Sequence, residues 1–371
     1  MKIAIVGAGW YGCHLAAFLR QIGFDVALFE RGAEVFTGAS GKNQNRLHLG
    51  FHYARDHTTR FQSRDGFSRF IERYPNLSRP VTDNIYAVPQ GDSLIDYRTY
   101  KAIMASSGIE FEELGEGHAA VAGLTRLAGR IDTEERIVDT GAAARFFRAY
   151  LDPVLRLGTR LRREDIREAA DGVRIGGERF DYLIDATWGK LTRPEIDIFY
   201  EPTLLLYYET RRTDWAFTLV DGQLCSIYPT DVPGQVTLSS VPHTPLGHFT
   251  DIAAAEHALA TLPAATIHEK RGLFEAQIRR YYPAFDESFT YVGPQLSMKT
   301  KPVGAEDNRA CYVFRQGRVF CVMSGKIDTI FVAAERIISS IGQPDFGSGF
   351  GPGFGSVPTL LTGTPARVSA R

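Results

Sequence analysis

Little in this sequence points to an extracellular, metal-binding or membrane-spanning protein. Four cysteines are present, and none lies in a C-x-x-C pair or in a Cys/His cluster with metal-ligand spacing. Scattered cysteines of this kind are typical of buried thiols in a reducing compartment. No stretch stays apolar for the roughly 18 residues of a membrane helix, and residues 1–7 lack the long apolar core of a signal peptide. We therefore expect a cytoplasmic protein without a metal or membrane contacts.

An excess of positive charge is also missing. The 371 residues include 42 Lys plus Arg against 43 Asp plus Glu, which gives a formal net charge of -1. Because no summed positive field results, nucleic acid is not an expected partner. At roughly 150 residues per domain, the length predicts two or three domains. Length and charge leave the oligomeric state open.

The first thirty residues have the pattern of a complete β-α-β unit. Residues 2–6 are a short apolar run, which predicts a buried parallel strand. The motif Gly7-Ala8-Gly9-Trp10-Tyr11-Gly12 follows, and apolar residues then recur at helical spacing until Gly23. Residues 26–29 predict a second strand that ends at Glu30.

This unit predicts a dinucleotide site. Gly7 permits a tight turn, Gly9 lets a pyrophosphate approach the backbone, and Gly12 lets the helix pack closely on the sheet. Free N–H groups at the helix start attract phosphates. The Glu30 carboxylate can bind an adenosine ribose and would repel a 2′-phosphate, which disfavours NADP. The predicted contacts are Gly7, Gly9, Trp10, Tyr11, Gly12, Glu30 and Arg31.

The segment after this unit favours FAD over NAD. An NAD dehydrogenase would continue with further β-α repeats, whereas residues 37–60 are rich in Gly, Asn, Arg and His. Such a polar stretch is typical of a loop that forms part of a site.

Two short motifs lie in this loop. Ser40-Gly41-Lys42-Asn43 is similar to an S-G-[RH]-N segment, and Leu47-His48-Leu49-Gly50 with Tyr53 is similar to [VIL]-H-x-G-x-x-Y. With the first motif, they resemble the D-amino-acid oxidase superfamily of FAD oxidoreductases, which includes glycine and sarcosine oxidases and L-2-hydroxyglutarate dehydrogenase. The resemblance implies that FAD contacts Ser40, Lys42, Asn43 and Asn45.

A strand and turn in the middle of the chain extend the resemblance. Residues 180–189 are similar to the family's h-h-N-A-x-G segment, with Asp185 in place of the usual Asn. Trp188 is unusual at this turn, and both a stacked lid and a core residue are open interpretations. By resemblance, FAD also contacts Ala186, Thr187 and Gly189.

A third region of resemblance lies near the C-terminal end. Residues 301–309 are similar to the family's [RK]-P-x(n)-D segment, and a strand at 319–323, a turn at 324–329 and a helix at 330–341 follow. In the family this helix points its N-terminus at the flavin pyrimidine carbonyl, where its dipole stabilises anionic reduced flavin. Most relatives have a Gly-rich turn here. The implied FAD contacts are Gly325, Lys326, Ile327 and Asp328.

The remaining segments predict a second domain. Apolar and polar residues alternate in parts of 85–135 and 195–290, which favours antiparallel strands. We predict an α/β fold with a Rossmann-like FAD-binding domain and a discontinuous, mostly antiparallel substrate domain. The predicted ranges are 1–85, 136–195 and 291–342 for the FAD-binding domain, 86–135 and 196–290 for the substrate domain, and 343–371 for a flexible Gly-rich tail. An active-site flap is the alternative for the tail.

Four residues are candidates for chemistry. Flavin oxidation moves a hydride to N5, so the protein must orient a C–H bond and take up a proton. His48 is the candidate general base or donor to substrate; a structural histidine and a covalent flavin link are the alternatives. Arg46 and Lys326 are candidates for a substrate carboxylate or a flavin carbonyl, and Tyr228 for a pocket wall. The alternative for Arg46 and Lys326 is an ordinary solvated surface cation, and the alternative for Tyr228 is an ordinary core residue.

The sequence thus predicts an FAD-dependent oxidoreductase that oxidises a CH–NH bond of a small polar metabolite. The choice of CH–NH rests on the frequency of amine substrates in the superfamily. A 2-hydroxyacid or other CH–OH dehydrogenase is the alternative, which the His48 motif favours. A flavin isomerase without net redox change and an idle FAD-binding scaffold are further alternatives. The electron acceptor, oxygen or another compound, is left open.

Overall fold

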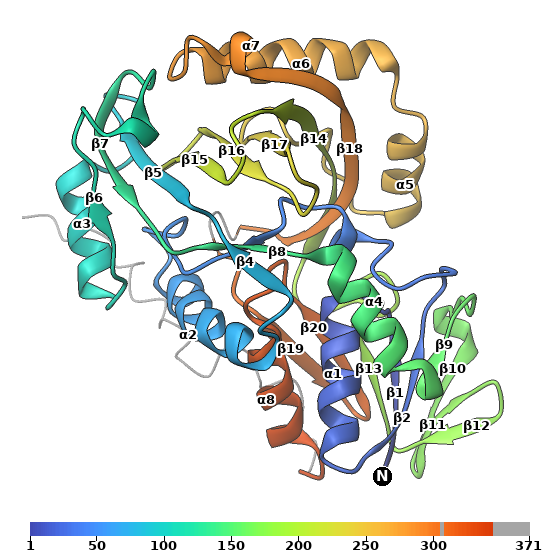
Figure 1. The fold of residues 1–371 in the computed structure, drawn as a ribbon. Coiled ribbons are helices and arrows are strands. Elements are labelled where there is room, and N and C mark those ends of the chain that lie inside the picture. Colours follow the sequence, from blue (N-terminus) through green and yellow to red (C-terminus); the bar gives the residue numbers. More distant parts are fainter. Residues whose placement is uncertain (305–307, 344–371) are drawn as a thin grey trace, which may run out of the picture.

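A six-stranded sheet carries the predicted dinucleotide motif in the computed structural model, which describes residues 1–304 and 308–343 (Figure 1). The strand order is β19-β20-β13-β1-β2-β9, and every pair is parallel except β19 with β20. The predicted β-α-β unit is confirmed, with α1 (Trp10–Gln21) between β1 and β2. The strands are β1 (Lys2–Val6), β2 (Asp25–Phe29), β9 (Leu155–Arg156), β13 (Tyr182–Asp185), β19 (Tyr312–Gln316) and β20 (Val319–Met323).

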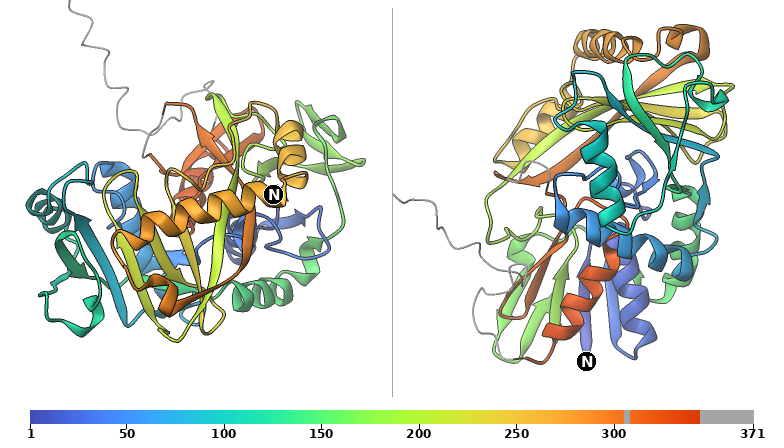
Figure 2. Two further views of the ribbon diagram at one scale, coloured as in Figure 1. Left: turned by 90° about the horizontal axis from the view of Figure 1, so that it is seen from above. Right: turned by 90° about the vertical axis from the view of Figure 1, so that its left-hand side faces the viewer.

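Both faces of this sheet are covered because its strand residues are apolar on each side. Ile3 and Ile5 pack among helices on one face, whereas Ala4 and Val6 pack against a small antiparallel sheet on the other. Figure 2 shows α1 and α8 side by side on the helical face. The helices there are α1, α2 (His57–Arg73), α4 (Thr140–Tyr150) and α8 (Ile330–Ser340). The small sheet consists of β10 (Ile166–Ala169), β11 (Gly172–Ile175) and β12 (Glu178–Phe180).

An eight-stranded sheet forms the other half of the molecule (Figure 1). Its order is β18-β14-β17-β16-β15-β5-β7-β6, and only β15 and β5 pair in parallel. This largely antiparallel arrangement agrees with the predicted alternation. The strands are β5 (Asp83–Pro89), β6 (Glu112–Glu113), β7 (Leu127–Asp132), β14 (Ile198–Thr210), β15 (Trp215–Leu219), β16 (Cys225–Pro229), β17 (Gln235–Ser240) and β18 (Phe289–Pro302).

Helices flank this second sheet, and a short sheet lies between the two halves (Figure 1). Phe274 and Ile278 of α6 pack against Leu206 and Leu238 of the large sheet. The flanking helices are α3 (Tyr97–Ser106), α5 (Ile252–Ala260), α6 (Ala264–Arg279) and α7 (Phe285–Ser288). The short sheet is β3 (Arg46–Leu47), β8 (Arg136–Val138) and β4 (Ser78–Pro80).

The fold class is confirmed, while the predicted domain ranges stay predictions. One predicted boundary, between residues 290 and 291, falls inside β18, all of which pairs with β14 in the eight-stranded sheet. The predicted tail lies outside the described residues from position 344 onward. Within 1–304 and 308–343, no helix has the length and apolarity of a membrane span. The same residues contain no group of three or more side chains suited to holding a metal ion.

Candidate functional site

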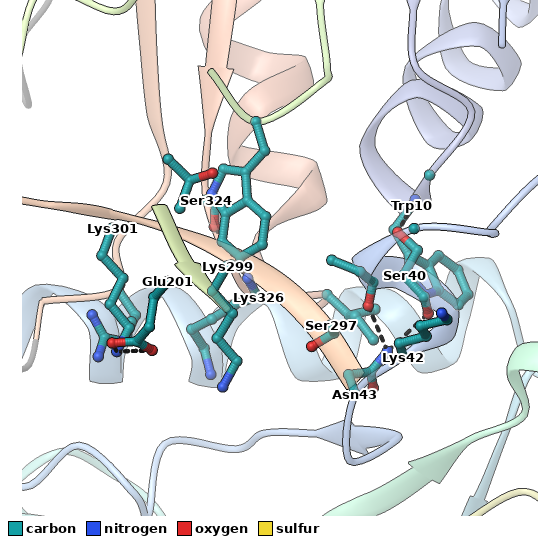
Figure 3. A pocket seen from close by; sticks show the side chains of 18 of the residues that line it. Trp10, Ser40, Lys42, Asn43, Glu201, Ser297, Lys299, Lys301, Ser324 and Lys326 are labelled. Carbon is teal, nitrogen blue, oxygen red and sulfur yellow. Dashed lines mark hydrogen bonds and ion pairs between the residues drawn. The ribbon is translucent and has the colours of Figure 1, made fainter. Parts of the chain in front are cut away.

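A cavity of about 810 Å³ is lined from both large sheets. One wall consists of the turns that follow β1, β2, β13 and β20, and the opposite wall of residues from β14, β16, β17 and β18. In open α/β sheets, ligands bind beyond the carboxyl ends of the strands, and the volume is in the range of small-molecule sites. Figure 3 shows Ser40, Lys42 and Asn43 on one side of the view, and Lys301 with Glu201 on the other.

The glycines of the first turn have the steric roles that the motif predicts. Gly7 has φ +98°, and a Cβ added to Gly12 would lie 1.8 Å from the Gly7 carbonyl oxygen. A Cβ on Gly9 would lie 2.6 Å from Ser40 Oγ, which accepts a 3.0 Å hydrogen bond from the Trp10 backbone N–H. Gly7 and Gly9 line the cavity, whereas Gly12 is behind the turn and shapes it through packing.

The two aromatic residues of this turn have different positions. The Trp10 indole is buried among Phe36, Phe70 and Phe147, so only its backbone is suited to a ligand contact. The Tyr11 hydroxyl donates a 2.7 Å hydrogen bond to the backbone carbonyl of Lys326. Tyr11 therefore ties α1 to the turn that precedes α8.

Glu30 lies at the end of β2 and lines the cavity, as does Arg31. The Glu30 carboxylate accepts hydrogen bonds from the backbone N–H groups of Ala8 (2.7 Å) and Gly32 (2.8 Å). Its position beside the glycine turn suits binding of an adenosine ribose. The Arg31 guanidinium is half exposed and pairs with Glu256 at 3.4 Å.

The loop after β2 is held by its own asparagines. Asn43 Nδ2 donates to the carbonyls of Ala39 (3.2 Å) and Ser40 (2.8 Å), and its Oδ1 accepts from the Asn45 N–H (2.7 Å). Lys42 and Asn43 line the cavity. Asn45 does not, because its side chain points toward β8 and α4, where it donates to the Val138 carbonyl and to Thr140 Oγ1. This geometry gives the Asn45 side chain a structural position, and its predicted cofactor contact stays a prediction.

The turn after β13 is organised by Asp185. This buried carboxylate accepts hydrogen bonds from the backbone N–H and hydroxyl groups of Thr187 and Thr192. Burial raises the pKa of Asp185 above its ordinary value despite these bonds. Ala186 and Thr187 line the cavity. Gly189 lies outside the lining, at φ +74°.

Trp188 lies at the border between the cavity and the core, so the stacked-lid interpretation stays a prediction. It lines the cavity, and it also packs against a hydrophobic cluster that contains Ile198 and Met298. A Cβ on Gly325 would lie 3.0 Å from the Trp188 ring, so Gly325 gives the ring room beside the last turn.

The turn before α8 places Lys326 in a buried position. Its side chain is 2% exposed, with Nζ 3.5 Å from Asp328 Oδ1 and 4.2 Å from the centre of the Tyr53 ring. Gly325, Lys326 and Ile327 line the cavity. Asp328 is fully buried outside it, and burial raises the pKa of this carboxyl. Asp328 therefore forms an ion pair with Lys326 from outside the lining, and its predicted cofactor contact stays a prediction.

His48 and Arg46 meet at a buried carboxylate that the sequence did not reveal. His48 Nδ1 lies 3.5 Å from Glu135 Oε1, which accepts a 2.8 Å hydrogen bond from the Leu49 N–H. Tyr86 links the other oxygen of Glu135 to Arg46, through hydrogen bonds of 2.7 and 3.0 Å. Burial, and then the charges of Lys326 and Arg46, hold the pKa of His48 well below its ordinary value. His48 is therefore a neutral imidazole at neutral pH.

Tyr228 supports Arg46 from behind. The Arg46 guanidinium lies 4.0 Å from the centre of the Tyr228 ring, and the Tyr228 hydroxyl donates to the Arg136 carbonyl. Arg46 and His48 line the cavity, but Tyr228 is fully buried and does not. The predicted pocket wall is therefore formed by Arg46, with Tyr228 beneath it.

The sequence also missed Lys299 and Glu201. Ser297, Lys299 and Lys301 are alternate residues of β18, which face the same side of the strand, and all three line the cavity. Glu201 stands opposite Lys299 in the β14–β18 register, yet its carboxylate binds Lys301. Burial, and then the charge of Lys301, lower the pKa of Lys299 to about 8. The period-two spacing of these polar residues was the available signal.

The lining suits FAD by the shape of its backbone and by the charges it offers. The turn around Gly9 has no space for a side chain, since a Cβ would collide with Ser40, and Glu30 stands beside it. At the far end, Lys326 Nζ has no hydrogen-bond acceptor within the described part of the chain. The first turn and Glu30 would hold the ADP half, and residues 325–327 would contact the flavin.

Known proteins match this chain over most of its length. The family model for FAD dependent oxidoreductases, DAO, matches residues 2–315. The FAD-dependent monooxygenase FPY4 of Fusarium mangiferae is 55% identical over 340 residues, which are 92% of this chain and 91% of that protein. The FAD-dependent monooxygenase kojA of Aspergillus flavus is 27% identical over 370 residues, covering 92% and 86% of the two chains.

Solved structures share the fold at low sequence identity. Glycine oxidase from Geobacillus kaustophilus has a TM-score of 0.67 at 15% identity, over 91% of this chain and 94% of that one. L-alpha-glycerophosphate oxidase from Mycoplasma pneumoniae, solved with FAD bound, has a TM-score of 0.69 at 12% identity, over 92% and 95%. The glycine turn and the Glu30 carboxylate line one cavity, and the family model matches most of the sequence. The chain therefore belongs to the DAO family of FAD-dependent oxidoreductases.

Proposed function

We propose that the enzyme oxidises a CH–OH bond of a small polar metabolite that carries a further oxygen or anionic group. The observation that carries this proposal is Lys299, which lines the cavity and makes no hydrogen bond or ion pair with any described residue. A free cation in the cavity favours a substrate with a carboxylate or other oxygen group, and it disfavours a protonated amine placed directly beside it. The proposal thus takes the CH–OH alternative of the sequence analysis, which the His48 motif also favours, in place of a CH–NH bond.

His48 can take the proton of the substrate hydroxyl. Its pKa is held well below the ordinary value, so the ring is in the basic form at neutral pH. The Glu135 carboxylate, with Oε1 3.5 Å from Nδ1, is the anion beside the ring. Lys299 would bind the substrate oxygen that does not react, and Arg46 and Trp188 would exclude water. Bound FAD supplies the hydride acceptor.

The test of this proposal compares hydroxy compounds with amines of the same skeleton. Holoprotein is mixed without oxygen with matched pairs such as lactate and alanine, or 2-hydroxyglutarate and glutamate, and bleaching of the oxidised flavin absorption is followed. We expect the hydroxy member of a pair to bleach the flavin faster. Faster bleaching by the amine, or no bleaching by any hydroxy compound, would contradict the proposal. Bleaching without prior reduction also separates this reaction from a flavin isomerase.

Replacing Lys299 tests the substrate contact. In Lys299→Met we expect KM for the hydroxy substrate to rise about tenfold or more, the effect of losing one charge-assisted hydrogen bond, with kcat less affected. In the parent enzyme KM should rise as the pH passes through about 8, where Lys299 loses its charge. Lys299→Arg should restore part of the binding. Lys101→Met, at a surface ion pair with Glu113, is the matched control. An unchanged KM in Lys299→Met would remove this residue from the site.

Monooxygenation is the second candidate, and the 55% identity to a protein named FAD-dependent monooxygenase favours it. In that case one oxygen atom of O₂ would enter the product. The reaction under ¹⁸O₂ with mass analysis of the product distinguishes the two: a label in the product supports monooxygenation, and unlabelled product with hydrogen peroxide supports oxidation alone.

A further inference from the structure

We infer that Lys301, Glu201 and His248 form a proton-transfer route between the cavity and solvent. The inference rests on the proposed function only in that the enzyme cycles bound FAD between its oxidised and reduced forms. It concerns residues outside the His48 and Lys299 contacts described above, and it assigns His248 a part in the reaction although this side chain does not line the cavity.

The three side chains form a continuous chain of contacts. Lys301 Nζ lies 2.6 and 2.8 Å from the two oxygens of Glu201, and His248 Nε2 lies 3.2 Å from Glu201 Oε2. Lys301 and Glu201 line the cavity. The exposed fractions of the side chains are 21% for Lys301, 2% for Glu201 and 62% for His248. The buried carboxylate of Glu201 therefore joins a cavity lysine to an imidazole in solvent. Figure 3 shows the Lys301–Glu201 pair.

The fold holds these side chains in place through backbone pairing. Tyr200 and Phe249 form an isolated antiparallel bridge with two hydrogen bonds, of 2.7 and 2.9 Å. This bridge brings the neighbouring residues Glu201 and His248 together. The centre of the Phe199 ring lies 4.6 Å from that of the His248 ring, so the two side chains pack together.

Flavin turnover requires a proton path. Oxidation of a CH–OH bond to C=O gives one hydride and one proton, and the proton must leave the cavity. Reoxidation by oxygen follows FADH⁻ + O₂ + H⁺ → FAD + H₂O₂, so one proton must enter. Lys301 can pass a proton to Glu201 while it takes another from the cavity, and Glu201 can exchange protons with His248. Burial, followed by the charge of Arg309, lowers the pKa of Lys301, which eases this exchange. Besides Arg309, Lys299 is a cation close to Lys301.

The experiment measures proton movement without an organic substrate. Holoenzyme is reduced with stoichiometric dithionite and mixed with oxygenated, weakly buffered phenol red, and flavin absorbance and dye colour are followed together. If oxygen does not react, ferricenium serves as the acceptor, and one proton is then released per flavin. In His248→Gln we expect both signals to slow about tenfold, and added imidazole should restore them. His257→Gln, an exposed histidine on α5, is the matched control.

The outcomes separate this inference from the proposed function. Wild-type rates in His248→Gln would overturn the route, and so would slowing that imidazole does not restore, because a purely structural role predicts that result. Thermal unfolding of the variant is measured alongside. Glu201→Gln should slow the signals without rescue. Failure of every CH–OH compound to reduce the flavin would contradict the proposed function and leave these measurements unaffected.

Discussion

Single side chains of the cavity owe their charge states to burial among neighbouring cations. His48 stays neutral because desolvation and the charges of Lys326 and Arg46 oppose its protonation. Lys299 is easier to deprotonate than an ordinary lysine for the same reasons. Glu135, which no sequence motif indicated, is the buried anion that links Arg46 to His48 through Tyr86.

Replacing His48 should impair flavin reduction and leave flavin binding intact. In His48→Asn we expect the anaerobic reduction rate to fall about 100-fold, the contribution of a general base. In the parent enzyme the rate should show no inflection near pH 6.5, because the lowered pKa keeps the ring basic down to more acidic pH. Stopped-flow reduction across pH measures both. His57→Asn, an exposed residue at the start of α2, is the control. An unaltered reduction rate would make His48 a structural residue.

Two helices pack against turns that border the cavity through glycines at which no side chain would fit. Gly12 of α1 packs against the Gly7 carbonyl, and Gly66 of α2 packs in the same way against Asp328, where a Cβ would lie 1.8 Å from the backbone oxygen. The motif predicted the first contact. Nothing near Gly66 in the sequence predicted the second, because its partner is over 260 positions away.

Gly66→Ala should displace α2 from the turn that carries Lys326. We expect the free energy of unfolding to fall by about 1–3 kcal/mol, as for overpacked cores, and FAD to be released more readily. Gly272→Ala is the matched control, because Gly272 lies within α6 and nothing is near its Cβ position. There alanine should raise the free energy of unfolding by about 1 kcal/mol through its higher helix propensity. Urea unfolding and flavin retention on gel filtration are the measurements. If the two variants had the same free energy of unfolding and retained flavin equally well, the contact between α2 and Asp328 would not be the close packing that we infer.

Stability across the molecule should depend on pH through His14 in the helical layer. This buried ring bonds to the Tyr74 hydroxyl at 2.7 Å, and burial lowers its pKa to about 3. In the unfolded chain His14 is protonated below about pH 6.5, whereas in the folded protein it stays neutral down to about pH 3. The free energy of unfolding therefore falls as the pH drops from 6.5 toward 3. The slope from this group is about 1.4 kcal/mol per pH unit.

The variant His14→Asn isolates this effect. We expect this variant to be less stable than the parent protein at pH 7. Between pH 6.5 and 4 its free energy of unfolding should fall less steeply than that of the parent, by about 1.4 kcal/mol per pH unit. Urea unfolding of both proteins at several pH values measures the slopes. The remaining histidines are common to both proteins and cancel in the difference. Parallel slopes would mean that the folded protein protonates His14 at ordinary pH.

The sequence was sufficient for the fold class, the family and FAD, because the glycine turn with Glu30 and the later motifs are short segments whose backbone geometry is set by their own residues. It also identified His48, Arg46 and Lys326 as candidates, and these line the cavity as expected. Asn45, Tyr228 and Asp328 lie outside the cavity lining, and the contacts that hold Asn45 and Tyr228 there come from residues far along the chain. Only the tertiary structure brought Glu135 to His48 and placed Glu201 between Lys301 and His248, since strand register and burial decide which distant charges meet.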